Sequence, residues 1–409
     1  MSLLRNRNFV VMWIEQLATI FGNRFSEIAI PLIVLQLTGS PLNAALALVC
    51  QQLAPLLLSL SAGSIAEGRS KKKIAMGADA VSFLTMLLLA GMVLINELTL
   101  WKLGAALFIL GAAGVFFRVS FGAMVPGVAG RSRLVEAHTY FEGADAVSTL
   151  AGPVLAGVVL SAFGAVWALA VDAVTFFISF LGILFLTVSG TPKKEKKEGL
   201  TSKGDFSLNG ISLLVKNPLQ RFVTFNQAVL SFTTTAITLT VIVYTSSVLD
   251  FQEWQTGFVL SAAGAGNLIG VLLLHKLSRL SWGMLYGGLM GISAAGIFLI
   301  MGSSHMYFLA LGMFLFDGAL SVAFVINGTA RQAITPDSFL ARIGGAGLLL
   351  GGTAAICGNL FAGGVSESAD PRAVLGVCGF LLLFASVIAF AFKQGKRSVR
   401  ELEPIALDE

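Results

Sequence analysis

Apolar stretches of about twenty residues recur along almost the whole 409-residue chain, separated by short polar segments. A helix needs about 20 mostly apolar residues to cross the hydrocarbon core of a bilayer. Charged residues make up only 12% of the chain, whereas soluble domains hold roughly 25%. The sequence therefore predicts an all-α polytopic membrane protein, with transmembrane helices at residues 9–37, 42–66, 74–95, 99–123, 138–162, 166–188, 219–248, 255–275, 282–302, 306–328, 342–365 and 372–392.

The distribution of basic residues supports these twelve spans. If the N-terminus lies in the cytoplasm, 23 of the 27 lysines and arginines fall in cytoplasmic segments, as the positive-inside rule requires. Of the other four, Lys102 and Arg372 lie at the outer surface, and Arg24 and Arg118 lie within spans. This asymmetry predicts that both termini are cytoplasmic. Because the net charge of +5 is dispersed in short clusters, it does not indicate a nucleic-acid partner.

The longest hydrophilic segment, residues 189–218, divides the spans into two groups of six. Its lysine- and glutamate-rich run is typical of a cytoplasmic linker, and its apolar residues leave open whether a short helix lies along the membrane surface. The segments that follow the fourth and tenth spans also resemble each other. Such weak repetition is typical of transporters with two pseudo-symmetric bundles, expected here at residues 1–188 and 219–392, with a cytoplasmic tail at 393–409.

The first span carries polar residues at steps of four, which places them along one face of a helix. These are Glu15, Thr19, Asn23 and Glu27, and Arg24 stands three residues before Glu27. Ionisable residues inside a membrane are costly, so each is a candidate functional residue. We interpret Asn23, Arg24 and Glu27 as candidates for substrate or proton handling. The alternative is a buried ion pair that only fixes helix packing.

A second polar stripe lies on the fifth span and includes Glu142 and Asp145. Glu142 is close to the predicted cytoplasmic end, where water can solvate it, whereas Asp145 lies deeper. Arg118 in the fourth span needs an acidic partner, and pairing with Glu27 or Asp145 would stabilise that carboxylate until a substrate or proton intervenes. All three are candidates for coupling, and a packing role remains the alternative for Asp145.

The remaining candidates are expected to line a central cavity. They are Phe21, Phe25, Phe116, Phe117 and Phe121 in the first half, and Thr234 and Thr238 in the second half. A few charges among many aromatic rings suit an amphiphilic organic solute. A metal ion would need clustered oxygen or imidazole ligands, so neither a metal site nor a cofactor is expected. No nucleotide-binding or hydrolase motif appears, so the sequence predicts neither a primary pump nor an enzyme.

The segment after the second span reads GSIAEGRSKKK at residues 63–73, and here the chain resembles the major facilitator superfamily. Glu67 stands where that family usually has aspartate, and Arg69 is displaced by one position. The resemblance implies that this segment braces the two halves during the conformational change. It assigns gating roles to Gly63, Glu67, Arg69 and Lys71.

Other segments are similar to a subgroup of bacterial drug, macrolide and enterobactin exporters. These include the segment that ends at Asp79, and Gly152-Pro153, which resembles the family's antiporter motif. The resemblance adds Asp79, Gly152 and Pro153 to the expected gating residues and implies a bacterial inner membrane. We therefore expect a monomeric, proton-coupled exporter of hydrophobic or amphiphilic small molecules. The alternatives are a facilitative lipid or lysolipid flippase and a membrane sensor that transports nothing.

Overall fold

The computed structural model describes residues 3–66, 69–130, 133–186, 217–277, 281–335 and 340–392. Within these residues, twelve helices are long and apolar enough to cross a membrane, and no strand occurs. The predicted all-α, twelve-helix fold class is confirmed. The helices are α1 (Arg7–Thr38), α2 (Pro41–Ala66), α3 (Lys71–Leu94), α4 (Leu100–Ala129), α5 (Leu134–Phe163), α6 (Ala165–Phe185), α8 (Pro218–Val243), α9 (Glu253–Leu277), α10 (Trp282–Met301), α11 (Met306–Ile334), α12 (Leu340–Ser368) and α13 (Arg372–Ala391).

Several helices are longer than the spans expected from hydropathy. Helix α4 continues to Ala129 and α5 begins at Leu134, whereas the expected boundaries are 123 and 138. Hydropathy marks the part of a helix that lies in lipid, and a helix can continue beyond the hydrocarbon core. Residues 244–248 form a separate π-helix directly after α8. Most of the predicted linker, Glu67 and the predicted tail lie outside the described residues.

Polar residues and glycines set several of the helix ends. The Asn6 side chain accepts hydrogen bonds from the first turn of α1, and Gly39 ends that helix with a left-handed φ of 65°. Asn217 caps α8 in the same way, and Pro218 occupies the first turn, where its missing N–H leaves no hydrogen bond unmade. These local signals explain why the helices begin and end close to the predicted positions.

The chain folds as two compact units. The first comprises Met1–Lys196 and Thr245–Ser261, and the second comprises Lys197–Tyr244 and Ala262–Glu409. The sequence placed the whole of residues 219–392 in the second bundle, whereas residues 245–261 belong to the first unit. Residues 245–261 group with the first unit because the start of α9 packs closely on α5. A Cβ at Gly257 of α9 would lie only 3.1 Å from the Cα of Val154 in α5.

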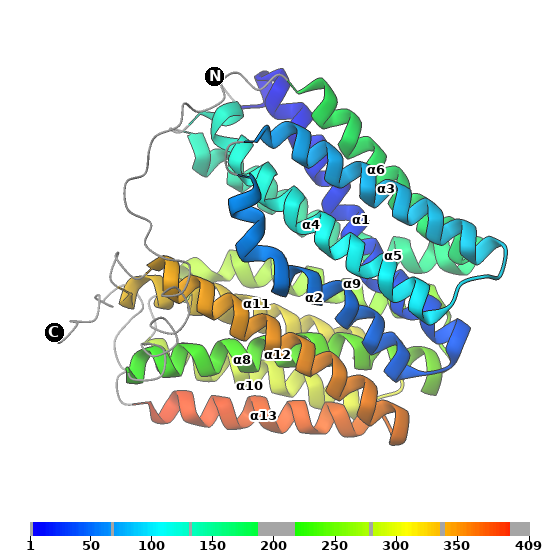
Figure 1. Ribbon diagram of the computed structural model, residues 1–409. Helices are drawn as coiled ribbons and strands as arrows, with labels where there is room; N and C mark the ends of the chain where they lie inside the picture. The colour runs from blue at the N-terminus through cyan, green and yellow to red at the C-terminus, as the bar shows by residue number, and fades with distance from the viewer. Residues whose placement is uncertain are drawn as a thin grey trace. The chain divides into compact units, whose positions relative to one another are not determined.

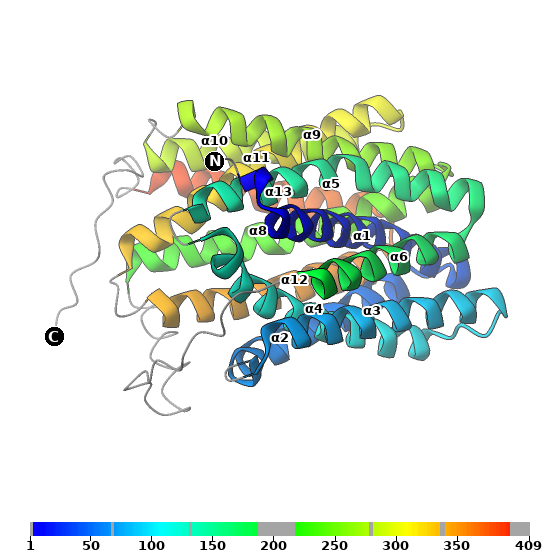
Figure 2. The ribbon, with the colours of Figure 1, turned by 90° about the horizontal axis from the view of Figure 1, so that it is seen from above.

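In the first unit, α1 packs against both α5 and α6, and α3 packs against α4 and α6. Figure 1 shows α3 beside α6, and Figure 2 shows α1 between α5 and α6. This arrangement brings the polar face of α1 onto α5 and α6.

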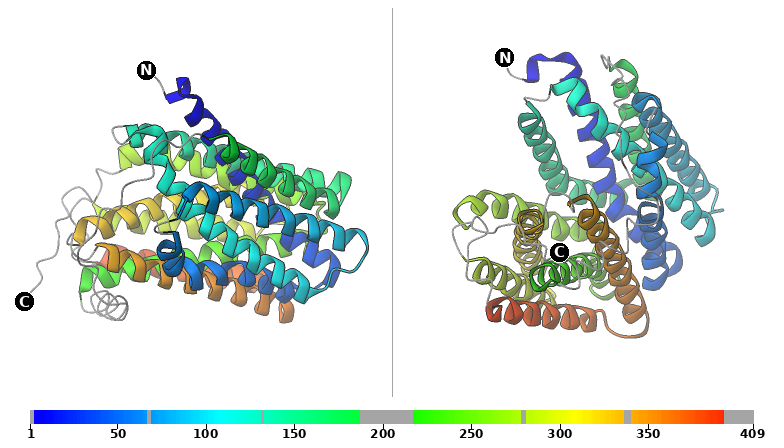
Figure 3. Two further views of the ribbon diagram at one scale, coloured as in Figure 1. Left: turned by 45° about the horizontal axis from the view of Figure 1, so that its top comes forward. Right: turned by 60° about the vertical axis from the view of Figure 1, so that its left-hand side comes forward.

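In the second unit, α8 packs against α12 and α13, and α10 packs against α11 and α13. The red α13 lies along these neighbours in Figure 3. Glycines allow the close approach of other helices, because a Cβ on Gly266 of α9 would lie 3.1 Å from the Cα of Gly318 in α11. Small residues at helix contacts are the usual means of tight packing in membranes.

Candidate functional site

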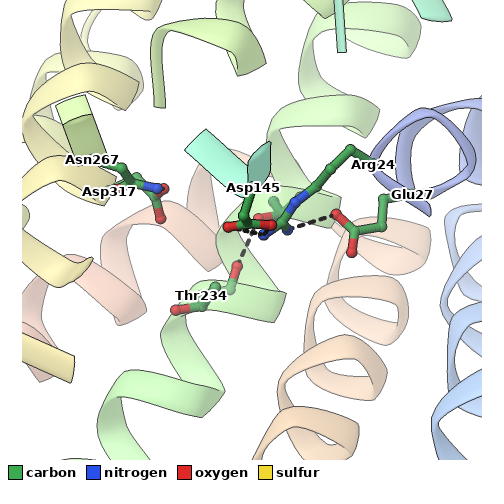
Figure 4. A network of polar contacts seen from close by, with 7 residues as sticks. Arg24, Glu27, Asp145, Thr234, Asn267 and Asp317 are labelled. Atoms are coloured by element: carbon green, nitrogen blue, oxygen red, sulfur yellow. Dashed lines mark hydrogen bonds and ion pairs between the residues drawn. The ribbon is translucent and has the colours of Figure 1, made fainter. Parts of the chain in front are cut away.

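Arg24, Glu27 and Asp145 form an ion-paired group in the first unit, which we call the Arg24 cluster (Figure 4). Arg24 Nη1 donates to Glu27 Oε2 at 3.1 Å. Nη2 donates to Asp145 Oδ1 at 3.1 Å and to Oδ2 at 3.2 Å. One cation therefore holds two carboxylates, and the cluster has a formal charge of −1 when all three groups are ionised.

Helix spacing and helix contact together build this cluster. Glu27 stands one turn after Arg24 on α1, and Asp145 comes from α5. Gly152 lies two turns after Asp145, on the same face of α5. A Cβ at Gly152 would lie 2.9 Å from Arg24 Cβ, so the glycine lets α1 approach α5 closely enough for the two ion pairs. Pro153 follows it inside the helix.

The side chains of the Arg24 cluster are not sealed in the protein. Their exposed fractions are 33% for Arg24, 53% for Glu27 and 42% for Asp145. The cluster is therefore partly open to solvent, unlike a structural ion pair enclosed in a core. The cluster brings together three of the six residues that the sequence assigns to substrate or proton coupling.

Arg118 does not pair with Glu27 or Asp145, contrary to the sequence-based expectation. All three side chains are described, and the ion pairs of both carboxylates go to Arg24 alone. Helix α4 packs mainly against α2 and α3, and Arg118 lines a cavity bounded by α3 and α6. Direct packing of α1 on α5 instead makes Arg24 the shared partner.

The other two coupling candidates lie outside the Arg24 cluster. Asn23 is exposed and lines the same cavity as Arg118. Glu142 is also exposed, and the described part of the chain gives it no ion pair. Its position fits the solvated role that the sequence suggested for it.

The predicted aromatic lining is only partly gathered around one cavity. Phe117 and Phe121 stack with ring centroids 5.6 Å apart, and both line the cavity of the first unit. Phe25 is buried beside Phe21, and Phe116 packs at the edge of the core. In the second unit, Thr234 and Thr238 each donate to a carbonyl one turn earlier in α8, so their hydroxyls already have partners.

The residues expected to act in gating lie on different elements. Gly63 is in the last turn of α2, and the exposed Arg69 precedes Ser70, which caps α3. Lys71 begins α3, whereas Glu67 lies outside the described residues. Asp79 is fully buried in α3. Its expected role in gating stays a prediction.

A polar cavity of about 130 Å³ lies within the first unit. Asp79 from α3 and Asp172 from α6 both line it, and each is 1% exposed. Sequence reasoning did not single out Asp172, although a carboxylate in the middle of a predicted span was a sufficient signal. Glu15, also 1% exposed, was noted only as part of the polar face of α1.

The second unit has a larger cavity of about 530 Å³, lined by small residues of α12 and by Gln227, Ser231 and Arg331. Arg331 Nε and Nη2 are buried and have no hydrogen-bond partner in the described part of the chain. Elsewhere in this unit, Asn267 Nδ2 donates to Asp317 Oδ2 at 2.8 Å (Figure 4). The sequence did not single out Arg331.

Comparison with known proteins gives matches along most of the chain. The model of the Major Facilitator Superfamily matches residues 12–350. The enterobactin exporter EntS of Escherichia coli O1:K1 is 25% identical over 419 residues, covering 99% of this chain and 96% of that protein. The EntS of Escherichia coli strain UTI89 gives the same values.

Solved structures share the fold at lower sequence identity. The nucleoside transporter NupG matches with a TM-score of 0.72 and 16% identity, covering 95% of this chain and all of that one. A bacterial homologue of the iron transporter ferroportin, in its inward-facing state, matches with a TM-score of 0.68 and 17% identity over 97% of this chain. At these identities the likeness concerns the fold alone.

Proposed function

The chain belongs to the major facilitator superfamily, and from this premise we propose that it is a proton-coupled exporter of amphiphilic small molecules. It would work by alternating access, with two halves that move around a central site. The resemblance to enterobactin exporters across nearly the whole chain supports outward transport. The observation that carries the proposal is the partly solvent-exposed Arg24 cluster inside a helical membrane bundle.

The Arg24 cluster provides both charge and the means to change it. Arg24 shares its guanidinium between Glu27 and Asp145. When both carboxylates are ionised, the cluster carries a charge of −1 and can hold a cationic or hydrogen-bond-donating group of the solute. When either carboxylate takes up a proton, this negative charge is lost and the solute is released. The proton and the solute therefore exclude each other at the cluster, as exchange of one for the other requires.

Aromatic side chains on the helix that carries Arg24 and Glu27 support an organic solute rather than a simple ion. Phe21 and Phe25 lie on the same helix as Arg24, with ring centroids 6.2 Å apart. Apolar and aromatic walls with a few polar groups are typical of sites for organic ligands. In the described residues, no group of three acidic, histidine or cysteine side chains is placed to hold a metal ion. We therefore place drugs, macrolides and siderophores among the candidate solutes.

The test is transport by the purified protein in liposomes. We would follow internal pH and solute flux for cationic, neutral and zwitterionic amphiphiles, together with enterobactin. Glu27→Gln and Asp145→Asn remove one charge each with little change in shape, so we expect either change to abolish gradient-driven flux. Glu97→Gln is the matched control, because Glu97 is 66% exposed and pairs only with Lys102 in the described structure.

The outcomes separate the alternatives. The exporter is supported if flux requires a proton gradient and is lost in both cluster variants but not in Glu97→Gln. Flux that persists after the gradient is collapsed would instead assign a facilitative flippase. Solute binding without flux would assign a sensor.

A further inference from the structure

Three carboxyl groups lie deep in the first unit without a cationic partner. Glu15 on α1, Asp79 on α3 and Asp172 on α6 are each 1% exposed. None of them forms an ion pair with a described residue, and the described ion pairs all involve other carboxylates. A buried carboxylate without a counter-charge is very unfavourable. These groups therefore need protons or a cation. Arg24 forms its ion pairs with Glu27 and Asp145, and Arg118 lines the cavity with Asp79 and Asp172 but forms no ion pair with a described residue.

Ser179 shows where one proton must lie. Its Oγ is 2.9 Å from Glu15 Oε2 and 2.7 Å from Asp79 Oδ2, both within hydrogen-bonding distance. A serine hydroxyl has a single hydrogen and can donate to only one of the two oxygens. The second hydrogen bond therefore requires a proton on a carboxyl group, which donates to Ser179 Oγ. We call Glu15 and Asp79, bridged by Ser179, the Glu15–Asp79 pair. This geometry requires one proton shared within the pair.

Asp172 belongs to the same polar interior. Ser26 donates to Asp172 Oδ2, and Thr175 Oγ1 lies 3.3 Å from Asp172 Oδ1. Asp79 and Asp172 line the same cavity. Thr19 also lines the cavity and is 5% exposed, and its hydroxyl has no hydrogen-bond partner among the described residues. A buried, unsatisfied hydroxyl that borders a cavity indicates that the cavity holds a polar occupant.

The size of the cavity restricts that occupant. A volume of about 130 Å³ holds only a few water molecules at roughly 30 Å³ each, whereas pockets for organic ligands measure about 300–1,000 Å³. An organic solute of the size that such pockets hold is thus too large for it. Water and protons fit.

We propose that the Glu15–Asp79 pair, bridged by Ser179, is a proton-binding site of the transporter, and that water in the cavity passes its proton to Asp172. In this step the donor carboxyl becomes a carboxylate, the Asp172 carboxylate becomes a carboxylic acid, and the total charge is unchanged. The charged and titratable groups that line the cavity are Asp79 from α3, Arg118 from α4 and Asp172 from α6. Glu15 from α1 lies beside them and reaches Asp79 through Ser179. Helix α2 contributes Gln51, which does not titrate.

This assignment adds a second proton site to the Arg24 cluster. The Arg24 cluster is exposed and ion-paired, and the proton and the solute compete for it. The Glu15–Asp79 pair is buried, forms no ion pair with a described residue and binds only a proton. Helix α1 carries residues of both sites, so a shift of α1 affects them together. That this proton drives export depends on the function proposed above, whereas its presence on the pair does not.

Infrared spectroscopy of the whole protein in lipid tests the proton directly. A protonated carboxyl group has a C=O stretch distinct from that of a carboxylate. We expect this band at neutral pH in the unaltered protein, and we expect Asp79→Asn or Glu15→Gln to remove or shift it. Glu97→Gln should leave it unchanged. A band that is missing in the unaltered protein, or that neither variant affects, would overturn the proposal.

Two further measurements keep the test decisive. If Asp79→Asn does not fold, Ser179→Ala retains both carboxyl groups and removes only the bridging hydroxyl, so the band should shift. In liposomes, Asp79→Asn should lose about tenfold or more of gradient-driven accumulation, equivalent to about 1.4 kcal/mol, while solute exchange without a gradient continues. Accumulation that follows a sodium gradient instead would overturn the coupling role. If the unaltered protein shows the band but no proton-dependent flux, the proposed function fails and the proton site stands.

Discussion

At the scale of single residues, the geometry of Arg24 makes it hard to replace. Its two terminal nitrogens contact different carboxylates, 3.1 Å from Glu27 and 3.1 Å from Asp145. Lysine has the same charge but a single ammonium group, which cannot reproduce this planar, forked arrangement. We therefore expect Arg24→Lys to reduce the initial rate of gradient-driven flux by about tenfold or more, a loss of roughly 1.4 kcal/mol.

The measurement is the initial flux rate in liposomes, with solute binding measured separately. The exposed Lys102→Arg exchange is a suitable control, because Lys102 pairs with Glu97 near the start of α4, away from the Arg24 cluster. Unchanged flux in Arg24→Lys would show that only the positive charge matters at this position.

The residues of the site could be predicted from sequence only in part. A charged residue in an apolar span can be recognised, and this identified Arg24, Glu27, Arg118 and Asp145. Pairing between helices cannot be recognised in the same way, because it depends on which helices are neighbours. The spacing of three residues correctly predicts the Arg24–Glu27 pair within α1, whereas the assignment of Arg118 to Glu27 or Asp145 fails because α4 does not pack on α5 closely enough.

At the scale of helices, the contact between α1 and α5 depends on Gly152. A Cβ at this position would lie 2.9 Å from Arg24 Cβ, whereas a Cβ at Gly143 of the same helix meets no atom within 4 Å. Replacing either glycine by alanine stabilises the helical conformation by about 1 kcal/mol. We expect Gly152→Ala to lower both the melting temperature and the flux, because α1 and α5 must separate. Gly143→Ala should preserve or raise the melting temperature and leave flux unchanged.

Thermal unfolding in detergent and flux in liposomes check this prediction. If the two glycine variants have the same melting temperature and the same flux, α1 and α5 can move apart without affecting the Arg24 cluster.

Helix positions were predictable because hydropathy and length determine them, and the twelve observed helices coincide with the twelve expected spans. The ends were less predictable, since α4 and α11 extend beyond the apolar segments. The buried Asp79 and Asp172 illustrate a further limit. Each is visible in the sequence as an acid within a span, but only the packing of α3 against α6 places both on one cavity.

At the scale of the whole molecule, the transmembrane potential sets the steepest solute gradient that the proposed exchange can sustain. One proton that moves across 100 mV releases about 2.3 kcal/mol, and a tenfold concentration ratio requires about 1.4 kcal/mol. For a neutral solute exchanged for one proton, an imposed potential of about 100 mV without a pH difference should sustain a ratio of roughly fifty. Two protons per solute would raise this limit to the order of two thousand.

Solute charge provides the internal control for this measurement. A monovalent cation exchanged for one proton moves no net charge, so the same potential should leave its concentration ratio near one, and only a pH difference should raise it. Liposomes with a potassium-diffusion potential and solutes of matched size allow both ratios to be measured at steady state. Accumulation of the neutral solute on the side that protons leave, without accumulation of the cation, would establish one-for-one electrogenic exchange. Equal ratios near one for both solutes would exclude coupling to the potential, because a charge-moving exchange must respond to it.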